Sequence, residues 1–146
     1  MNTSDEQINL LLDELLNLHP KKIDLSLDRT YKLLAKLGNP QEKIKNSVMC
    51  SGTNGKFSTL NFIKEILRYN KKTINAYISP HLIKFNERFE ILDKIVTNDE
   101  LYELLSEVKN VNQNENITFF EITTSAFFKI AAKHSNADYT LCEIGL

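Results

Sequence analysis

Two glycines and a lysine follow a short apolar run in the first half of the sequence. Gly52 and Gly55 enclose Thr53 and Asn54, and Lys56 comes directly after the second glycine. Glycines permit a loop whose backbone N–H groups turn inward, and the N-terminus of a following helix favours negative charge. A lysine at this place supplies a point charge for β- and γ-phosphates. The spacing therefore predicts a loop that binds the phosphates of a nucleotide.

A hydroxyl that coordinates Mg²⁺ is expected just after the lysine of such a loop, where Ser58 and Thr59 are the candidates. The strict P-loop pattern GxxxxGK[ST] fails at two positions, because Cys50 stands at its first glycine and Phe57 stands at its hydroxyl. An incidental glycine-containing turn between a strand and a helix is therefore the alternative interpretation.

The residues on both sides of this loop suit a phosphate site. Residues 47–51 are mostly apolar and predict a buried strand, and residues 73–78 predict another. Between them, apolar side chains recur at helical spacing from residue 56 to about residue 70. Strand, loop, helix and strand within so short a stretch form a βαβ unit, which implies a parallel sheet and an α/β fold.

Helix-start and helix-stop signals predict the remaining elements. Three segments, beginning at Ser4, Thr97 and Thr118, have the pattern of a capping box, in which two side chains satisfy each other's helix N-terminal amides. The other elements expected are helices over residues 8–16, 27–37 (with Gly38 as C-cap), 97–109 and 118–134, a polar loop over 111–116, a β-like piece over 89–96 and a strand over 139–144.

Glu143 ends the apolar strand and is the candidate acidic group. Burying a carboxylate is costly unless it is paired or bound to a metal. At the C-terminal end of a strand in an α/β fold it would face the ligand crevice. The alternative is an exposed side chain at a frayed strand end.

His81 and Arg88 are the candidate side chains of an irregular stretch over residues 79–88. A lone histidine is more often a surface or capping group, and a polar stretch such as residues 86–88 is often merely solvated. Arg88 is one of only three arginines in the chain, and an arginine on a loop near an anionic substrate would bind a carboxylate well. Binding groups also favour loops that rigid elements hold in place.

Thr118 and Glu121 have a local explanation, because each satisfies a helix N-terminal amide of the other. This role does not exclude a further contact of Thr118 with a ligand. In each of the pairs Phe119–Phe120 and Phe127–Phe128, at least one ring is expected to pack in the core.

Length and composition fit one soluble domain. The chain has 146 residues and a net charge of −1, which gives no global attraction to nucleic acid or to an anionic membrane. No apolar run approaches the roughly 20 residues that span a bilayer, and the polar, acidic N-terminus does not resemble a signal peptide. Cys50 and Cys142 are expected to be buried free thiols in a reducing cytoplasm. We expect a cytoplasmic monomer.

Residues 52–59 resemble the GTNGKGST loop of folylpolyglutamate synthase and dihydrofolate synthase, members of the Mur ligase superfamily. Phe57 departs from this pattern, because the family has a glycine there. Four further segments are similar to segments of the family in the same order: LGNPQ (37–41), SPHL with FNER (79–88), TFFE with two threonines (118–124) and EIGL (143–146). Together they are far more specific than the loop alone.

The resemblance implies a P-loop NTPase-like three-layer α/β domain with a mainly parallel sheet, preceded by two N-terminal helices. Residues 1–45 would form the helical segment, and residues 46–146 the first part of a Mur-ligase-type ATP-binding domain. We expect the chain to be truncated before its active site is complete, and to be inactive in ligation by itself.

The activity implied is ATP-dependent addition of L-glutamate to dihydropteroate, to a folylpolyglutamate or to both, through an acyl phosphate. Mg²⁺ would be the cofactor, and Lys56 the catalytic charge. By resemblance, the nucleotide is bound by Gly52, Thr53, Asn54, Gly55, Lys56, Phe57, Ser58 and Thr59, the metal by Ser58, Ser79 and Glu143, and the folate substrate by Ser79, His81, Arg88, Thr118 and Phe120.

Two rival functions stay open at this point. One is a peptidoglycan Mur ligase, which shares the loop and the acyl phosphate chemistry, although the stretch from Ser79 to Arg88 has the folate-type pattern. The other is nucleotide binding without turnover. The choice between dihydropteroate and folylglutamates, the glutamate chain length and the effect of Phe57 on the loop are also open.

Overall fold

The structure is a computed structural model that describes residues 3–18 and 26–145, so Leu146 of the last motif lies outside the described residues. The described residues divide into two compact units. One lies within residues 1–42 and 97–130, and the other within residues 43–96 and 131–146. Each unit is treated by itself below.

The first unit is helical. Its elements are α1 (Thr3–Leu16), α2 (Asp28–Lys36), the start of the short helix η1 (Pro40–Lys43), α4 (Asn98–Asn112) and most of α5 (Phe119–Lys133). Helices α1 and α4 pack together, and their apolar faces bury leucines such as Leu15 and Leu105 completely. Removing such side chains from water is the main favourable term in folding the unit.

Two of the three expected capping boxes are confirmed. The Thr97 hydroxyl accepts from the Glu100 N–H at 3.2 Å, and Glu100 accepts in return from the Thr97 N–H at 2.8 Å. At the start of α5, Thr118 and Glu121 make the same reciprocal pair, at 2.8 and 3.2 Å. Gly38 has φ +80° after α2, as expected of a C-cap.

The capping box expected at Ser4 is wrong. Ser4 lies inside α1, and its hydroxyl donates to an Asp99 carboxylate oxygen at 2.7 Å instead of capping its own helix. The Ser4 hydroxyl thus bonds to a side chain far away in the sequence, whereas the local pattern predicted a bond to a backbone N–H of its own helix. Helix α4 also runs three residues beyond the expected end at residue 109, to Asn112, and stops where Gln113 adopts φ +56°.

The second unit is a five-stranded sheet with strand order β1-β5-β2-β3-β4. The strands are β1 (Ser47–Cys50), β2 (Ile74–Tyr77), β3 (Phe89–Ile91), β4 (Lys94–Ile95) and β5 (Tyr139–Glu143). Strand β5 pairs in parallel with β1 on one side and with β2 on the other. The C-terminal ends of these three strands therefore meet at one edge of the sheet.

The sheet is mixed, which corrects the expectation of a mainly parallel one. Strand β3 pairs antiparallel with β2, and β4 pairs antiparallel with β3. The cause is local: β3 and β4 form a tight hairpin over Leu92 and Asp93, both at positive φ. A hairpin needs only a short turn, whereas a parallel neighbour needs a long crossover.

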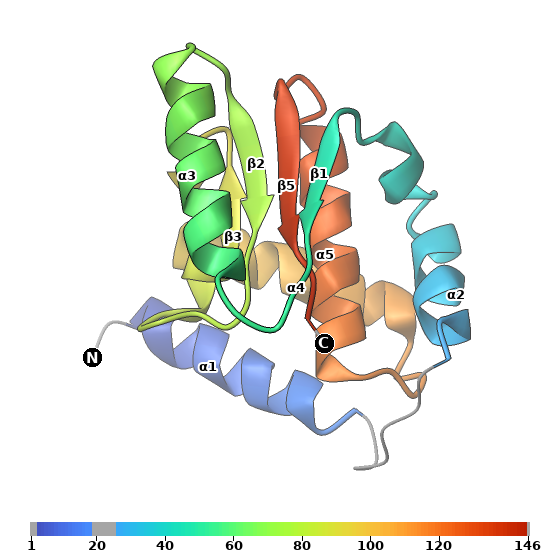
Figure 1. Ribbon diagram of the computed structural model, residues 1–146. Coiled ribbons are helices and arrows are strands. Elements are labelled where there is room, and N and C mark those ends of the chain that lie inside the picture. The colour runs from blue at the N-terminus through green and yellow to red at the C-terminus, as the bar shows by residue number, and fades with distance from the viewer. Residues whose placement is uncertain (1–2, 19–25, 146) are drawn as a thin grey trace. The chain divides into compact units, whose positions relative to one another are not determined.

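Helix α3 (Lys56–Tyr69) covers one face of this sheet (Figure 1). Leu60 of the helix is 1% exposed and joins a core with Ile74, Ala76, Ile78 and Leu141. Because the helix begins directly after the glycine loop, this packing fixes the helix N-terminus at the C-terminal edge of the strands.

A cluster of charged side chains joins α3 to the hairpin. The Glu90 carboxylate of β3 is buried and forms ion pairs with Lys64, at 2.5 Å, and with Arg68. Arg68 also donates to Asp93 in the hairpin turn at 2.9 Å. Each oxygen of the buried Glu90 carboxylate is thus paired with a cation, which offsets the cost of removing the carboxylate from water.

No helix in the described part of the chain is both long enough and apolar enough to span a bilayer.

Candidate functional site

The glycine loop joins β1 to α3 and adopts a backbone that needs its glycines. Gly52 has φ +152° and Gly55 has φ +77°, and both values lie in the region that L-residues rarely adopt. Gly55 is the residue immediately before α3. Thr53, Asn54 and Gly55 are exposed, so the loop is open to a ligand.

The Lys56 side chain folds back over this loop. Its amine donates to the Gly52 carbonyl oxygen at 2.8 Å and lies 3.9 Å from a Glu143 carboxylate oxygen. Glu143 is only 5% exposed, at the end of β5, and is in register with Cys50 at the end of β1. The positive and the acidic candidate side chains therefore lie together at the same edge of the sheet.

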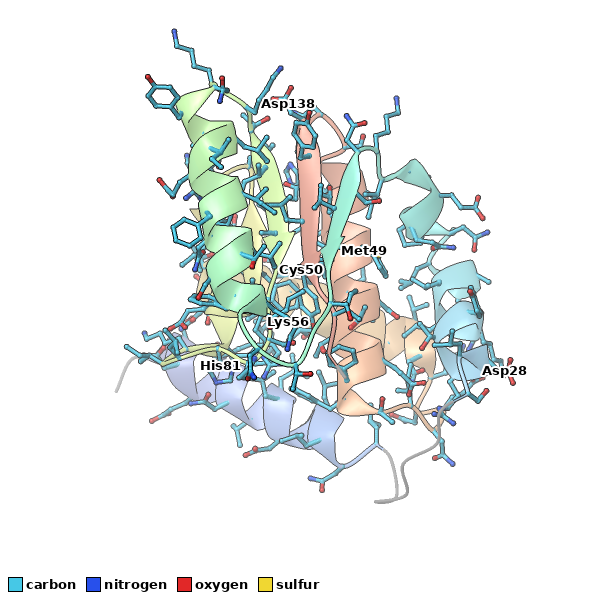
Figure 2. The ribbon with its side chains drawn as sticks, viewed as in Figure 1. Asp28, Met49, Cys50, Lys56, His81 and Asp138 are labelled. Atoms are coloured by element: carbon cyan, nitrogen blue, oxygen red, sulfur yellow. The ribbon has the colours of Figure 1, made fainter. Side chains whose placement is uncertain are left out.

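Ser79, which follows β2, completes this edge. Its backbone N–H donates to the second Glu143 carboxylate oxygen at 3.1 Å, and the Ser79–Pro80 peptide bond is cis. Three strand ends thus supply the glycine loop, Glu143 and Ser79. Figure 2 shows Lys56 and His81 at this end of the sheet and Asp138 at the opposite end.

The site has the donor set of a magnesium site that is completed by a ligand. Within residues 3–18 and 26–145, no three His, Cys, Asp or Glu side chains gather as they do in a closed metal site. Mg²⁺ is typically held by one or two carboxylates together with substrate phosphates and water. Glu143 supplies one carboxylate, and Ser58 and Thr59 in the first turn of α3 are exposed hydroxyls. These groups fit the ion.

The stretch between β2 and β3 is ordered around one phenylalanine. Phe85 is buried, and the His81 ring packs edge-on against it at 5.6 Å. The Arg88 guanidinium lies over the same ring at 4.9 Å and donates from Nε to His81 Nδ1 at 3.1 Å. Within the part of the chain that the structure describes, no hydrogen bond or ion pair uses the two terminal nitrogens of Arg88.

Sequence reasoning missed the residue that orders this stretch, Glu87. Its carboxylate accepts from the N–H groups of Leu82, Ile83 and Lys84 at 2.7 to 3.1 Å, with a further contact to Ile83 at 3.3 Å. The spacing of Lys84 and Glu87 is that of a capping box, so a search beyond Ser, Thr, Asp and Asn at the first position would have found it.

Thr118 and Phe120 belong to the helical unit, whereas the other candidate side chains belong to the sheet unit. Thr118 caps α5, and the Phe120 ring is 44% exposed. In the other expected pair of rings, Phe127 is fully buried in the core. The predicted substrate contacts of Thr118 and Phe120 stay predictions.

The Glu121 carboxylate of the α5 cap has two further partners besides Thr118. Arg29 on α2 donates to it at 3.2 Å, and Thr30 donates at 3.3 Å. Burial alone would raise the pKa of Glu121, but the hydroxyl and N–H of Thr118 and the Arg29 guanidinium outweigh it, so the pKa is lowered. The cap therefore also joins two helices of its unit.

The two cysteines are free thiols, as expected, but differ in burial. Cys142 is buried, and this burial raises the pKa of its thiol to about 12. Cys50 is half-buried at the start of the glycine loop, and its thiol lies 3.7 Å from the Lys56 carbonyl oxygen.

Curated relatives match nearly the whole chain. It is 34% identical over 126 residues to the dihydrofolate synthase/folylpolyglutamate synthase of Bacillus subtilis, covering 82% of this chain and 29% of the relative. It is 30% identical over 138 residues to the Escherichia coli protein of the same description, covering 92% of this chain and 32% of the relative. The chain thus spans about a third of the length of these relatives. No family model matches it.

Solved structures agree with the curated relatives. E. coli FolC in complex with DHPP and ADP has a TM-score of 0.86 at 27% identity, covering 100% of this chain and 35% of that one. Mycobacterium tuberculosis folylpolyglutamate synthase complexed with ADP has a TM-score of 0.82 at 26% identity, covering 98% and 32%.

The sequence relatives and the fold point to one group of proteins. Over the part that it spans, the chain belongs to the folylpolyglutamate synthase/dihydrofolate synthase family.

Proposed function

We propose that the protein is an ATP-dependent ligase that adds L-glutamate to dihydropteroate, to a folylpolyglutamate or to both. ATP phosphorylates a carboxylate of the folate substrate, and ADP leaves. The amine of L-glutamate then attacks the acyl phosphate carbon, the amide bond forms, and phosphate leaves. The single observation that carries the proposal is the meeting of Lys56, Glu143 and the glycine loop at one edge of three parallel strands.

At the nucleotide end, residues 52–59 bind the phosphates. The positive backbone angles of Gly52 and Gly55 suit a loop whose N–H groups point toward an anion, and α3 adds the partial positive charge of its N-terminus. Lys56 neutralises the negative charge of the phosphoryl group that is transferred. Phosphoryl transfer depends mainly on positioning and charge neutralisation, so the protein needs no nucleophile of its own.

Mg²⁺ is the cofactor in this proposal, and it would supply charge neutralisation on the phosphate oxygens. Glu143, Ser79 and Ser58 would hold it. The support is the burial of Glu143 beside the loop, because a carboxylate that is only 5% exposed needs a compensating positive charge. Lys56 at 3.9 Å is one such charge.

At the folate end, His81 and Arg88 contact the substrate. The contacts with His81 and Phe85 fix the orientation of the Arg88 guanidinium. Its two terminal nitrogens can then donate to a substrate. A guanidinium in this state suits a carboxylate, which it can bind through two parallel hydrogen bonds. Thr118 and Phe120 are proposed to line the pteroate pocket.

The finer fold assignment is part of the same proposal. Residues 46–146 would form the first part of a three-layer, P-loop NTPase-like domain of the Mur ligase type, and residues 1–45 the helical segment before it. The order β1, glycine loop, α3 and β2, with β5 inserted between the two strands, supports it. We also propose a monomer that binds neither nucleic acid nor membrane.

The names of the relatives support the choice of substrates. The E. coli and M. tuberculosis proteins were solved with ADP, and the E. coli protein also with DHPP. The relatives that match this chain are described as folate enzymes, which favours a folate substrate over a peptidoglycan precursor.

A ligation assay tests the proposal. The protein expressed from its complete reading frame is incubated with ATP, Mg²⁺ and L-glutamate, and with dihydropteroate or tetrahydrofolate in parallel. We expect a product one glutamate heavier, formed together with equal amounts of ADP and phosphate. Hydroxylamine in place of glutamate should trap the acyl phosphate as a hydroxamate.

Two outcomes would overturn the assignment. ATP binding with no product from either folate would leave a nucleotide-binding protein without turnover. Product formed only with a muramoyl peptide precursor would move the protein to the peptidoglycan ligases.

A further inference from the structure

The carboxylate of Glu87 gathers three consecutive backbone amides. Oε2 accepts from the Leu82 N–H at 2.7 Å, and Oε1 accepts from the Ile83 N–H at 3.1 Å and from the Lys84 N–H at 2.8 Å. Successive N–H groups that converge in this way form an anion-binding concavity, and here the anion is a side chain of the same stretch. The carboxylate thus orders residues 82–84 and at the same time caps the short 3-10 helix η2 (Phe85–Arg88), to which Glu87 belongs.

The same carboxylate stays ionised over a wide pH range. The N–H of Lys84, followed by that of Leu82, holds the pKa of Glu87 below its ordinary value. A charged acceptor makes stronger hydrogen bonds than a neutral one. The shape of residues 82–84 therefore depends on Glu87 itself and not on burial, because the Leu82 and Ile83 side chains are 80% and 85% exposed.

The folded segment lies between the two candidate substrate residues. His81 is the residue immediately before it, and Arg88 is the residue immediately after Glu87. The Arg88 Nε donates to His81 Nδ1 at 3.1 Å, and both groups pack on Phe85. Phe85 is in turn held against Phe89 of β3, with ring centroids 5.9 Å apart. Closing the turn at residues 82–84 is what returns the chain from His81 to Arg88.

We infer that Glu87 is a positioning residue for the folate substrate, acting through the His81–Arg88 pair that its turn brings together. The inference rests on the proposed ligase function and goes beyond it, because Glu87 faces its own backbone and not the ligand. A carboxylate on the substrate would bind an Arg88 whose orientation is already fixed. Binding would therefore cost little side-chain conformational entropy.

Kinetics on the protein from its complete reading frame test the inference. In Glu87→Ala the KM for the folate substrate should rise about tenfold, as expected for losing charge-assisted hydrogen bonds that order the loop. The KM for ATP should change less than about twofold, because the glycine loop is held by α3 and the sheet. The folate KM of Glu87→Gln should lie between those of the wild type and Glu87→Ala, because the one carbonyl oxygen of glutamine still accepts hydrogen bonds from N–H groups.

A double-mutant cycle separates positioning from general stability. If Glu87 acts through Arg88, then Glu87→Ala in an Arg88→Ala background should raise the folate KM less than about twofold further. Amide hydrogen exchange supplies an independent check: the N–H groups of Leu82, Ile83 and Lys84 should exchange faster in Glu87→Ala, whereas those of β5 should not change.

Glu65→Gln is the matched control. Glu65 lies in the same unit and its side chain is 71% exposed; among residues 3–18 and 26–145, its carboxylate pairs only with the Arg68 side chain, at 2.9 Å. The substitution removes the same charge without removing an acceptor of backbone N–H groups. The two KM values of this control should stay at the wild-type values.

The outcomes are distinct. Equal increases in both KM values, or faster exchange with an unchanged folate KM, would overturn the positioning role of Glu87 while the ligase function stands. A wild-type protein that forms no glutamylated product would overturn the proposed function, and the inference would fail with it.

Discussion

The Lys56 amine lies 3.9 Å from a carboxylate oxygen of Glu143, although the two residues come from opposite ends of the sheet unit's sequence. Lys56 is placed by the helix that follows the glycine loop, and Glu143 is placed by β5. Because β5 is in register with β1, Glu143 is opposite Cys50, the last residue before the loop. The strand register and the glycine loop that leads into α3 therefore together set the distance between the two charges.

Replacing Lys56 by methionine should abolish most turnover while the fold is kept. Loss of one group that stabilises developing charge costs about 100-fold in rate. ATP turnover in the ligation assay measures the loss. Lys72→Met is the control, because Lys72 is an exposed lysine that pairs with Asp138, which lies at the opposite end of the sheet. Equal activity in the two variants would contradict the role of Lys56.

Glu143→Gln should raise the concentration of Mg²⁺ needed for half-maximal activity by at least about tenfold, if this carboxylate holds the ion. A Mg²⁺ titration of ADP binding, followed by calorimetry, gives the same quantity without turnover. Should Glu143 serve only as the ion-pair partner of Lys56, the variant would lose stability but keep the wild-type Mg²⁺ dependence.

Gly55→Ala should weaken nucleotide binding and lower the free energy of unfolding by about 1 kcal/mol, the cost of a left-handed backbone for a residue with a Cβ. The strain is conformational, since a Cβ at Gly55 would meet no atom within 4 Å. Gly38→Ala is a close control, because Gly38 has φ +80° and equally open surroundings but caps a helix of the other unit. Gly38→Ala should lose the same stability and keep nucleotide affinity.

Thr118→Ala and Thr97→Ala remove the same type of helix cap from α5 and α4. Each should lower the free energy of unfolding by about 1 kcal/mol in urea denaturation. Only Thr118 is proposed to contact the folate substrate, so only Thr118→Ala should also raise the folate KM. If both variants have the same KM, the threonine of α5 is a cap and nothing more.

Glu121 predicts how stability depends on pH. Its pKa in the folded protein is below the ordinary value of 4.5, so the unfolded chain binds a proton first as the pH falls. The stabilisation by Glu121 is complete above pH 4.5 and is lost as the pH falls through the folded pKa. Glu121→Gln should therefore be less stable than the wild type at pH 7, and its stability should fall less steeply below pH 4.5. Urea denaturation at both pH values measures this difference.

The sequence was most informative where a local pattern decides the structure. The caps at Thr97 and Thr118 and the helix stop at Gly38 depend on residues a few positions apart. The strand, loop and helix around Gly52 to Lys56 are likewise fixed by neighbouring residues. The expectation for Glu143 combined such a pattern with a general rule, that ligands bind at the C-terminal ends of parallel strands.

The sequence did not predict features that depend on distant partners or on non-glycine residues at positive φ. Ser4 has a cap-like sequence but bonds to Asp99, far away along the chain. The end of α4 is set by Gln113, a non-glycine residue at φ +56°, which no composition rule marks as a stop. The antiparallel hairpin of β3 and β4 turns at Leu92 and Asp93 in place of the usual Asn-Gly.

Strand β5 lies between β1 and β2 in the sheet but comes later in the sequence than both of them. Strands β1 and β2 are not neighbours in the sheet, and β5 pairs with one edge of each. During synthesis, the edges of β1 and β2 that pair with β5 therefore stay unpaired until residues 139–143 have left the ribosome. The glycine loop and Glu143 are therefore brought together only when β5 inserts between β1 and β2.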